Sequence, residues 1–364
     1  MLYAMSRTRS VAWLVVCSLF GLCDATLIAG PPKKIDRDWN KYPAVVQVDT
    51  ERDVYVVGDP HADYERLVTL LTGTGIASGS TSDKPKDVPW SAGKSVVVFT
   101  GDYIDKGTES LPVIELVQSL QRAAAAEGGQ AIILMGNHEA EFLADWQSDK
   151  VAEFRNELTK DGLVPADVAA CKGDLGEFLC SLPFAARVND AFLCHAGNTQ
   201  GRTIKKLISD LENGVDSDGF ATEELIGADS LLEARLGEDK NPWIGADPKK
   251  TLTAYTSALG VAHIVQGHQP GKVKFPGKLN GEKVRRDKGE MFQRYGLIFL
   301  EDTGMSRGIG DDGAGYSQGA VLRIPASPTR KAVEAIAICY DGKAATIWDS
   351  GKNSEIGRIP PCGK

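Results

Sequence analysis

Short apolar runs recur along the chain, and just beyond five of them a glycine occurs together with Asp, Asn or His. Such runs, bounded by glycine, are typical of buried β-strands. Between the first three runs, residues 64–71 and 111–125 have the apolar spacing of helices. Strands that alternate with helices predict a layered α/β fold. The five runs are residues 54–57, 96–99, 131–135, 186–193 and 263–266.

The rest of the chain fits one catalytic domain over residues 40–350. Residues 200–260 are mostly helical in pattern and acidic, so we expect a helical insertion over one face. Residues 351–364 are expected to be a C-terminal tail. Further strands are expected at residues 297–300, 320–324, 335–340 and 345–348.

The polar residues of the five motifs are of the types that bind metals. Ligands of layered α/β folds gather at the carboxyl ends of strands, so these side chains are expected to converge. A mixture of carboxylate, amide and imidazole ligands suits Mn, Fe or Zn. A central carboxylate has two oxygens with which to bridge two cations. The candidate ligands are Asp59, His61, Asp102, Asn137, His195 and His268.

The spacing of these residues allows more than one division between two cations. In one arrangement, Asp59 and His61 hold the first cation, and Asp102 lies between it and the second. The second cation is then held by Asn137, His195 and His268. One such motif alone is more often a turn than a site, whereas five in order predict a metal centre.

In their order and form, the motifs GDPH, GDYIDKG, GNHE, HAG and GHQ resemble those of the calcineurin-like metallophosphoesterase superfamily. The second and third resemble its phosphoprotein-phosphatase branch, and the sequence EDTGMS at 301–306 resembles the bacterial-type Shewanella-like phosphatases. The resemblance covers about residues 54–306. It implies a four-layer metallophosphoesterase fold, with a central β-sandwich flanked by helices and a helical cap insertion.

The resemblance also implies a dinuclear hydrolase with two divalent or trivalent transition-metal ions (Mn, Fe or Zn), in which a metal-activated water attacks a phosphomonoester. His138, oriented by Asp105, would protonate the leaving oxygen, and Asn137 would also contact the substrate. A positioned acid assists an alkoxide or phenoxide leaving group, and a carboxylate keeps an imidazole protonated. The ligands implied are Asp59, His61, Asp102 and His268 at one ion, and Asp102, Asn137 and His195 at the other.

Several positions depart from the family pattern, mostly where phosphate would bind. Lys106 stands in place of an arginine of the second motif, which keeps the charge but loses the bidentate fork. Met135 stands where eukaryotic-type members have another arginine. No arginine occurs near residues 241–245, where one is expected by analogy, and Arg202 and Arg235 are possible substitutes. The other departures are Ala62 in place of glycine and Gln269 in place of threonine.

Three classes of function are compatible with this sequence. The first is a phosphatase acting on phosphorylated protein or peptide. The second is a phosphoesterase for small molecules or nucleotides with the same site. The third is a non-catalytic exported binding protein, which is disfavoured because all six candidate ligands are present. A net charge of −8 argues against a nucleic-acid-binding surface.

The amino-terminal residues are typical of a targeting segment. Arg7 and Arg9 precede an apolar run over residues 11–22, which is too short to span a membrane comfortably. We expect residues 1–25 to be a signal peptide, with an uncleaved anchor as the alternative. The protein is then exported, to the periplasm or the medium, with no stable membrane span after cleavage.

Five cysteines follow this segment, as expected for an oxidising compartment. Cys194 lies in an apolar run and is expected to be a buried thiol. The other four allow three pairings, of which the local one joins Cys171 to Cys180 and Cys339 to Cys362.

Overall fold

Two β-sheets form the centre of the computed structural model, which describes residues 35, 37–237, 243–310, 312–352 and 354–363. One sheet is six-stranded, in the order β14-β13-β12-β2-β3-β4. Its strands β2, β3 and β4 are parallel to one another, and β12 runs antiparallel to β2. Their bounds are β2 (Val54–Val57), β3 (Val96–Phe99), β4 (Gln130–Ile133), β12 (Ala320–Ile324), β13 (Glu334–Cys339) and β14 (Ala344–Asp349).

The second sheet is seven-stranded and mixed, in the order β1-β5-β6-β7-β11-β10-β15. Strands β6, β7 and β11 are parallel, whereas β10 is antiparallel to both β11 and β15. A separate two-stranded sheet joins β8 (Val273–Leu279) to β9 (Glu282–Arg286). The other bounds are β1 (Val45–Val48), β5 (Ala185–Val188), β6 (Ala191–Cys194), β7 (His263–Gln266), β10 (Met291–Arg294), β11 (Ile298–Leu300) and β15 (Ile356–Ile359).

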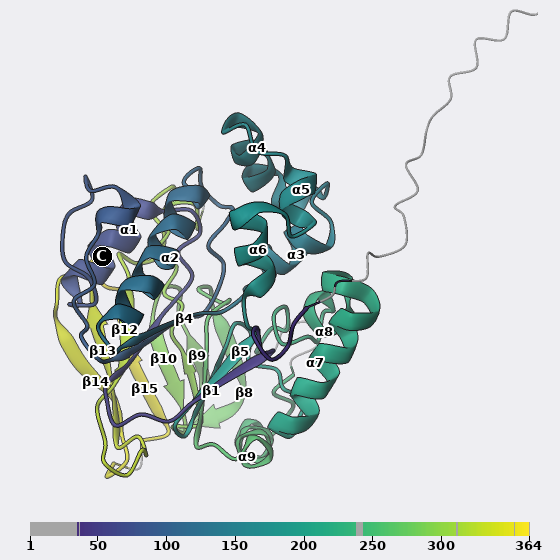
Figure 1. Cartoon of the computed structure of the whole chain (residues 1–364). Helices are drawn as coiled ribbons and strands as arrows, with labels where there is room; N and C mark the ends of the chain where they lie inside the picture. The colour runs from purple at the N-terminus through teal and green to yellow at the C-terminus, as the bar shows by residue number, and fades with distance from the viewer. Residues whose placement is uncertain (1–34, 36, 238–242, 311, 353, 364) are drawn as a thin grey trace, which may run out of the picture. The chain divides into compact units, whose positions relative to one another are not determined.

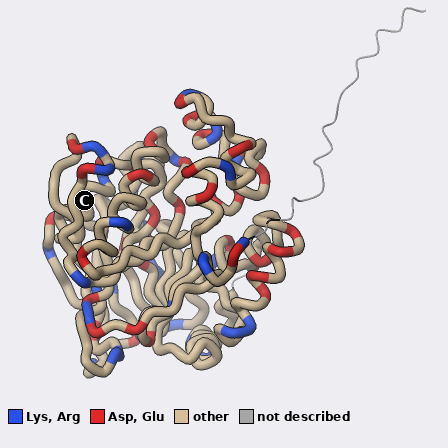
Figure 2. The backbone as a smooth tube through the Cα atoms, viewed as in Figure 1, with Lys and Arg blue, Asp and Glu red and all other residues tan. Residues whose placement is uncertain are grey.

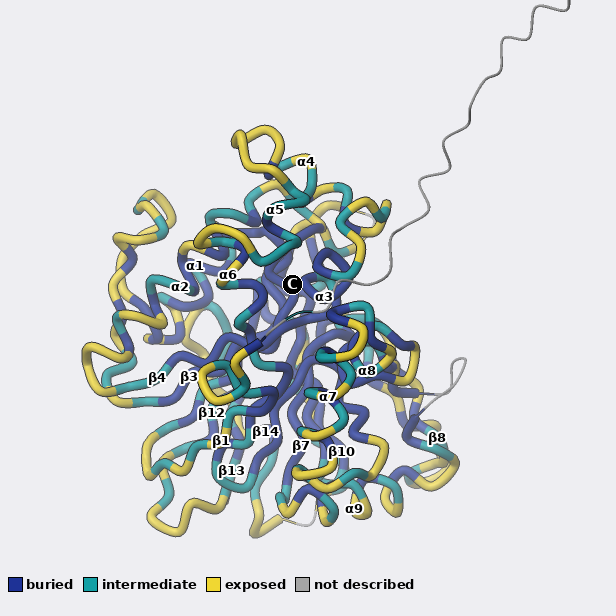
Figure 3. The backbone as a smooth tube through the Cα atoms, turned by 45° about the vertical axis from the view of Figure 1, so that its right-hand side comes forward, coloured by how far each residue is buried: buried dark blue, intermediate teal, exposed yellow. Residues whose placement is uncertain are grey.

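The central strands are apolar on both faces because alternate side chains pack into two different buried clusters, one on each side of the sheet. Val54 and Val56 share one buried cluster with Leu193 and Val265 of the other sheet, so the two sheets pack face to face. Val57, on the opposite face of β2, belongs to a second cluster that includes residues of the covering helices. Figure 3 shows that the strands are buried along most of their length. The central β-sandwich flanked by helices is therefore confirmed.

Helices cover the outer faces of both sheets. Figure 1 shows α1 and α2 over the sheet that contains β4 and β12. Leu207 and Leu211 of α7 share an apolar cluster with Phe192 and Ile264 of the second sheet. The helix bounds are α1 (Tyr64–Gly73), α2 (Ser110–Ala126), α3 (Asn137–Ala144), α4 (Ala152–Lys160), α5 (Pro165–Ala169), α6 (Gly173–Ser181), α7 (Ile204–Asp218), α8 (Glu223–Ile226) and α9 (Pro248–Leu259).

The predicted insertion over residues 200–260 is helical where it is described, because α7, α8 and α9 lie in it. Acidic residues gather on α7 and α8 (Figure 2). No helix in the described ranges combines the length and the apolar character that a membrane crossing requires. The expected signal peptide, residues 1–25, lies outside the described residues.

The expected tail at residues 351–364 was wrong as a boundary, because it contains β15. Ile356 and Ile359 pair with Arg294 and Met291 of β10 at the edge of the seven-stranded sheet. A four-residue strand whose centre is Gly-Arg has no apolar run, so its pattern was too weak to identify. The sandwich therefore continues beyond residue 350.

Two disulfides join the local cysteine pairs. One links Cys171 to Cys180 and the other links Cys339 to Cys362. Cys194 is a free thiol buried in β6, as expected. The second disulfide connects β13 of one sheet to the residues just after β15 of the other, so it joins the two sheets covalently.

Replacing Cys339 and Cys362 together by alanine should lower the free energy of unfolding by about 3 kcal/mol, because the open chain gains loop entropy when it unfolds. Urea unfolding followed by circular dichroism measures this change. The double replacement of Cys171 and Cys180 by alanine is the matched comparison. It should lower the free energy of unfolding by less, because the disulfide that it removes spans 9 residues rather than 23. An unchanged midpoint in the first variant would contradict the prediction.

Candidate metal centre

The five motifs lie together because they follow strands that end at one edge of the sandwich. Asp59, Asp102 and Asn137 follow the parallel strands β2, β3 and β4, and His195 and His268 follow the parallel strands β6 and β7. The backbone turns sharply at this edge. His61, Asp102 and His268 have positive φ angles of 39°, 53° and 67°. Such conformations are costly for residues other than glycine and are concentrated at functional sites.

Two glycines permit the close approach of neighbouring chain segments. A Cβ atom at Gly136 would overlap the backbone nitrogen and carboxylate of Asp102, and one at Gly267 would overlap the carboxylate of Asp59. Glycine is therefore required where these loops pack against the carboxylates.

Four side chains converge on one point. His195 Nε2 lies 2.9 Å from Asn137 Oδ1, 3.1 Å from His268 Nδ1 and 3.3 Å from Asp102 Oδ2. His268 Nδ1 is also 3.1 Å from Asn137 Oδ1. His195 Nδ1 lies 3.0 Å from the carbonyl oxygen of Thr100, and a proton placed there leaves the Nε2 lone pair free to bind a metal. This donor set fits a transition-metal cation.

Asp102 lies between this group and His61. Its Oδ2 atom is 3.3 Å from His195 Nε2 and 3.4 Å from His61 Nε2. Burial chiefly lowers the pKa of His61, to about 3, so its imidazole is neutral as a metal ligand must be. Burial opposes ionisation of Asp102, but the imidazoles of His195 and His138 outweigh it and hold the pKa of Asp102 well below its ordinary value. A bridging position for Asp102 is thus compatible with the geometry.

Asp59 is held beside this centre among other buried acids. Its Oδ2 accepts a hydrogen bond of 2.8 Å from the backbone N–H of His268. Burial raises the pKa of Asp59 well above its ordinary value, and the carboxylates of Asp302, Asp102 and Glu301 raise it further. Several carboxyl groups buried together are stable as anions only with positive charge among them. The site therefore fits the cations that the sequence predicts.

The position of His268 differs from the one that the resemblance implied. It was expected at the ion held by Asp59 and His61, but its Nδ1 atom lies against Asn137 and His195. Asp102, His195 and His268 form one group of converging ligand atoms, and His61, Asp102 and His138 form another. The structure thus favours the arrangement that spacing alone allowed, with His268 at the second site.

His138 and Asp105 are paired at the rim of the centre. His138 Nδ1 lies 3.0 Å from Asp105 Oδ2, and the other oxygen of Asp105 accepts a hydrogen bond from the N–H of Phe154 in α4. Burial opposes protonation of His138, but the negative charges of Asp102 and Asp105 outweigh it and raise its pKa to about 9. This direction favours the protonated imidazole that a proton donor requires.

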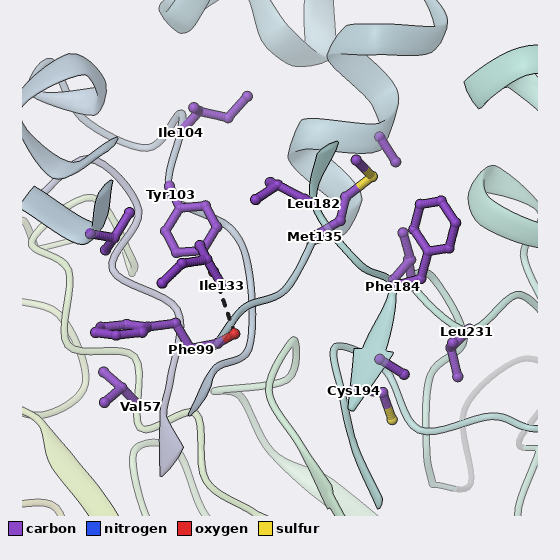
Figure 4. Packing of buried hydrophobic residues seen from close by; sticks show 14 of the residues in the cluster. Val57, Phe99, Tyr103, Ile104, Ile133, Met135, Leu182, Phe184, Cys194 and Leu231 are labelled. Atoms are coloured by element: carbon purple, nitrogen blue, oxygen red, sulfur yellow. Dashed lines mark hydrogen bonds between the residues drawn. The ribbon is translucent and has the colours of Figure 1, made fainter. Parts of the chain in front are cut away.

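The candidate phosphate-binding residues are placed differently. Met135 is buried in the apolar core, among other hydrophobic side chains (Figure 4). Arg202 is bound to Asp210 and Glu224 at 3.0 and 2.7 Å. Arg235 is exposed, and its positive charge acts on His268, whose pKa is lowered mainly by burial. Of the two substitutes considered, Arg235 is the one beside the centre.

Lys106 is exposed at the end of the second motif, with a φ angle of 58°. Gln269, the residue in place of threonine, has a structural role. Its side-chain oxygen accepts a 2.7 Å hydrogen bond from the N–H of Leu236, and its amide donates to the carbonyl of Leu236 at 3.3 Å. Gln269 therefore ties the segment that carries Arg235 to the loop of His268.

Three residues near the centre were not predicted as part of it. Glu233 Oε1 accepts a hydrogen bond of 3.3 Å from Asn137 Nδ2, which turns Oδ1 of that amide toward the histidines. Glu139 accepts hydrogen bonds from the N–H groups of Asp102 and Gly136. Thr100 donates to Glu301 at 2.8 Å. Glu139 lies in a motif, whereas Glu233 lies in the acidic insertion, where no local pattern distinguishes it.

Comparison with known proteins agrees with this geometry. The family model of the calcineurin-like phosphoesterases matches residues 53–272. An uncharacterized Schizosaccharomyces pombe protein is 26% identical over 329 residues, which cover 84% of each chain. Shewanella-like protein phosphatase 2 of Arabidopsis thaliana is 31% identical over 128 residues, covering 34% of this chain and 29% of that protein.

Among solved structures, a cold-active protein-tyrosine phosphatase of a psychrophilic Shewanella species is similar in fold. The TM-score is 0.60 at 19% identity, and the match covers 84% of this chain and 82% of that chain. This similarity shows that the two chains share a fold.

Replacing Glu233 by alanine should weaken binding at the second cation, because the amide of Asn137 can then rotate and present nitrogen in place of oxygen. We expect the affinity to fall about 10- to 100-fold, the range for outer partners of metal ligands. Glu233→Gln keeps an acceptor oxygen and should retain most of the affinity. Calorimetric titration of the metal-free protein with Mn²⁺ measures the change without turnover.

Glu223→Ala is the matched control, since Glu223 is an exposed acid of α8. It should bind both cations as the unmodified protein does. Equal affinities in the alanine variants of Glu233 and Glu223 would show that Glu233 does not orient Asn137.

Proposed function

Because the chain belongs to the calcineurin-like phosphoesterase family, we propose that it is a dinuclear phosphatase acting on phosphorylated proteins or peptides. The observation that carries this proposal is the pair of His138 and Asp105 beside the converging ligands. A protonated imidazole next to a metal centre suits the cleavage of esters whose leaving group needs a proton, such as phosphoserine.

We assign Asp59, His61 and Asp102 to the first cation. Asp102, Asn137, His195 and His268 serve the second. Bound there, two ions of Mn, Fe or Zn would polarise the phosphoryl oxygens and supply an activated water for in-line attack. Thr100 and Glu233 hold His195 and Asn137 in position through the hydrogen bonds described above.

His138 supplies the proton to the leaving oxygen in this mechanism. Asp105 fixes the ring through Nδ1, so Nε2 is the atom left to donate. Arg235 and Lys106 supply positive charge to the phosphate, and Asn137 contacts the substrate as well as the cation. Arg235 offers the phosphate both its charge and a bidentate fork, whereas Lys106 offers a point charge.

We further propose that the protein is exported to the periplasm or the medium. Two disulfides support this location, because they persist in oxidising compartments. The proposed signal peptide is residues 1–25, and the proposed catalytic domain extends from residue 40 through β15.

His138→Asn should separate proton donation from metal binding. Turnover of a phosphoserine peptide should fall about 10²- to 10⁴-fold, the usual contribution of one acid–base group. Loss with p-nitrophenyl phosphate should be much smaller, because nitrophenolate leaves without a proton. Steady-state kinetics on the two substrates, with metal content measured alongside, provide the test. Equal losses on both, or a lost cation, would overturn the role of His138.

Arg235→Ala should raise the KM for phosphate esters about tenfold, the effect of one charged hydrogen bond, with a smaller change in kcat. Lys106→Ala should act in the same direction, and Arg235→Lys should retain much of the affinity. Inhibition by inorganic phosphate gives an independent measure of the same contacts. An unchanged KM in both alanine variants would exclude these residues from phosphate binding.

The substrate class is tested by a panel of phosphopeptides, nucleotides and sugar phosphates. We expect the highest kcat/KM on the phosphopeptides. A preference for a nucleotide over every phosphopeptide would favour the small-molecule alternative.

A further inference from the structure

The hairpin of β8 and β9 carries like charges directly opposite one another. Lys274 is paired with Arg285, and Lys278 is paired with Lys283. All four residues are exposed. Residues that face each other across two strands lie on the same side of the sheet, so the four side chains form one basic face. The basic face thus consists of Lys274, Lys278, Lys283 and Arg285.

The opposite side of the hairpin is buried. Val273, Phe275 and Val284 belong to the apolar core, and Arg286 is fully buried beneath the hairpin. The alternation of buried and exposed residues fixes the basic face toward solvent. Figure 3 shows the outer end of β8 at the exposed surface.

Opposed like charges cost stability in a sheet, whereas a single lysine is enough to keep an exposed edge from pairing with other chains. An ion pair of 3.3 Å joins Arg285 to Asp287, both exposed or half-exposed. Such a concentration of positive charge is complementary to an acidic partner.

The base of the hairpin is fastened to the metal centre. Arg286 donates hydrogen bonds to the backbone carbonyls of Gln269 and Asp302, which flank the site, and to that of Gly271 at 3.1 Å. The strand β8 begins five residues after His268. The basic face therefore starts at the edge where the candidate ligands converge.

The segment of Arg235 packs against the same base. A Cβ atom at Gly237 would lie 3.0 Å from the carbonyl oxygen of Lys274, so the two segments are in close contact. Arg235, whose charge acts on His268, is two residues away. Positive charge thus continues from the centre onto the hairpin.

We propose that the basic face binds an acidic stretch of the substrate polypeptide next to its phosphorylated residue. This inference rests on the proposed phosphatase function and specifies the substrate class. The register of β8 is irregular between Lys274 and Lys278, so the stretch from Val273 to Lys278 lies opposite only Arg286 to Lys283 of β9. At about 3.3 Å per residue this is about 10 Å, the length of about three extended residues. The acidic residues are therefore those within about three positions of the phosphorylated residue, on the side that lies toward β8.

The test compares phosphopeptides that differ only in the residues flanking the phosphoserine. One has glutamates before it, one has glutamates after it, and one has glutamines on both sides. At an ionic strength of about 0.01 M, where screening is weak, one acidic peptide should have a KM about three- to tenfold lower than the glutamine peptide. Equal KM values for all three peptides would overturn the proposal.

The double variant Lys274→Gln/Arg285→Gln should lose this preference and keep its kcat and KM on p-nitrophenyl phosphate. Lys94→Gln/Lys331→Gln is the matched control, since both lysines are exposed near the amino ends of β3 and β13, away from the hairpin. It should keep the preference. Loss of the preference in both variants would mean that total charge, and not the basic face, attracts the peptide.

Binding of the unphosphorylated peptides, measured by fluorescence anisotropy, separates this inference from the proposed function. If no phosphopeptide is hydrolysed but the acidic peptide binds through Lys274 and Arg285, the proposed function fails and the basic face stands. If phosphopeptides are hydrolysed at rates that ignore their flanks, only the basic face fails. Tighter binding of a single-stranded oligonucleotide than of the acidic peptide would assign the face to nucleic acid and overturn the proposal.

Discussion

The burial of charge at one edge of the sandwich is the constraint on which the rest of the structure depends. Asp59, Asp102 and Asp302 are almost completely removed from water. Each loses hydration that neighbouring carboxylates cannot replace, so the edge is stable only with cations, imidazoles and backbone N–H groups arranged around it. The glycines after the strands, the left-handed turns and the carboxylate of Glu139 on the N–H of Asp102 all serve this arrangement.

The same constraint explains why residues outside the motifs form hydrogen bonds to the loops that carry the candidate ligands. The guanidinium of Arg286 donates hydrogen bonds to backbone carbonyls beside the centre, and the side chain of Gln269 accepts a hydrogen bond from the backbone of Leu236. Neither residue reaches a ligand of the proposed cations. Arg286 and Gln269 fix the distance between segments that carry charged residues. Electrostatic interactions in a buried site change steeply with that distance. The contact with Leu236 is thus a physical reason for glutamine in place of threonine at position 269.

The strand ends could be predicted because apolar runs and glycines are local properties of the sequence. The pairing of His138 with Asp105 was predicted from the resemblance of the motifs to those of the family, and the structure places the two side chains together. The grouping of His268 could not be decided, since it depends on the direction of a ring after a turn with φ of 67°. Glu233 lies 96 positions from Asn137, and only the folding of the insertion brings them together. Strand β15 was missed because pairing with β10, not its own composition, makes it a strand.

The disulfide between Cys339 and Cys362 has a consequence for the lifetime of the folded protein. Chain ends usually fray first and offer proteases their first site of attack. Here the last strand of one sheet is fastened to β13 of the other, so an edge strand cannot peel away without distorting the sandwich. Loss of the native state then requires a larger cooperative opening, which is slow. Such resistance determines how long each molecule remains folded.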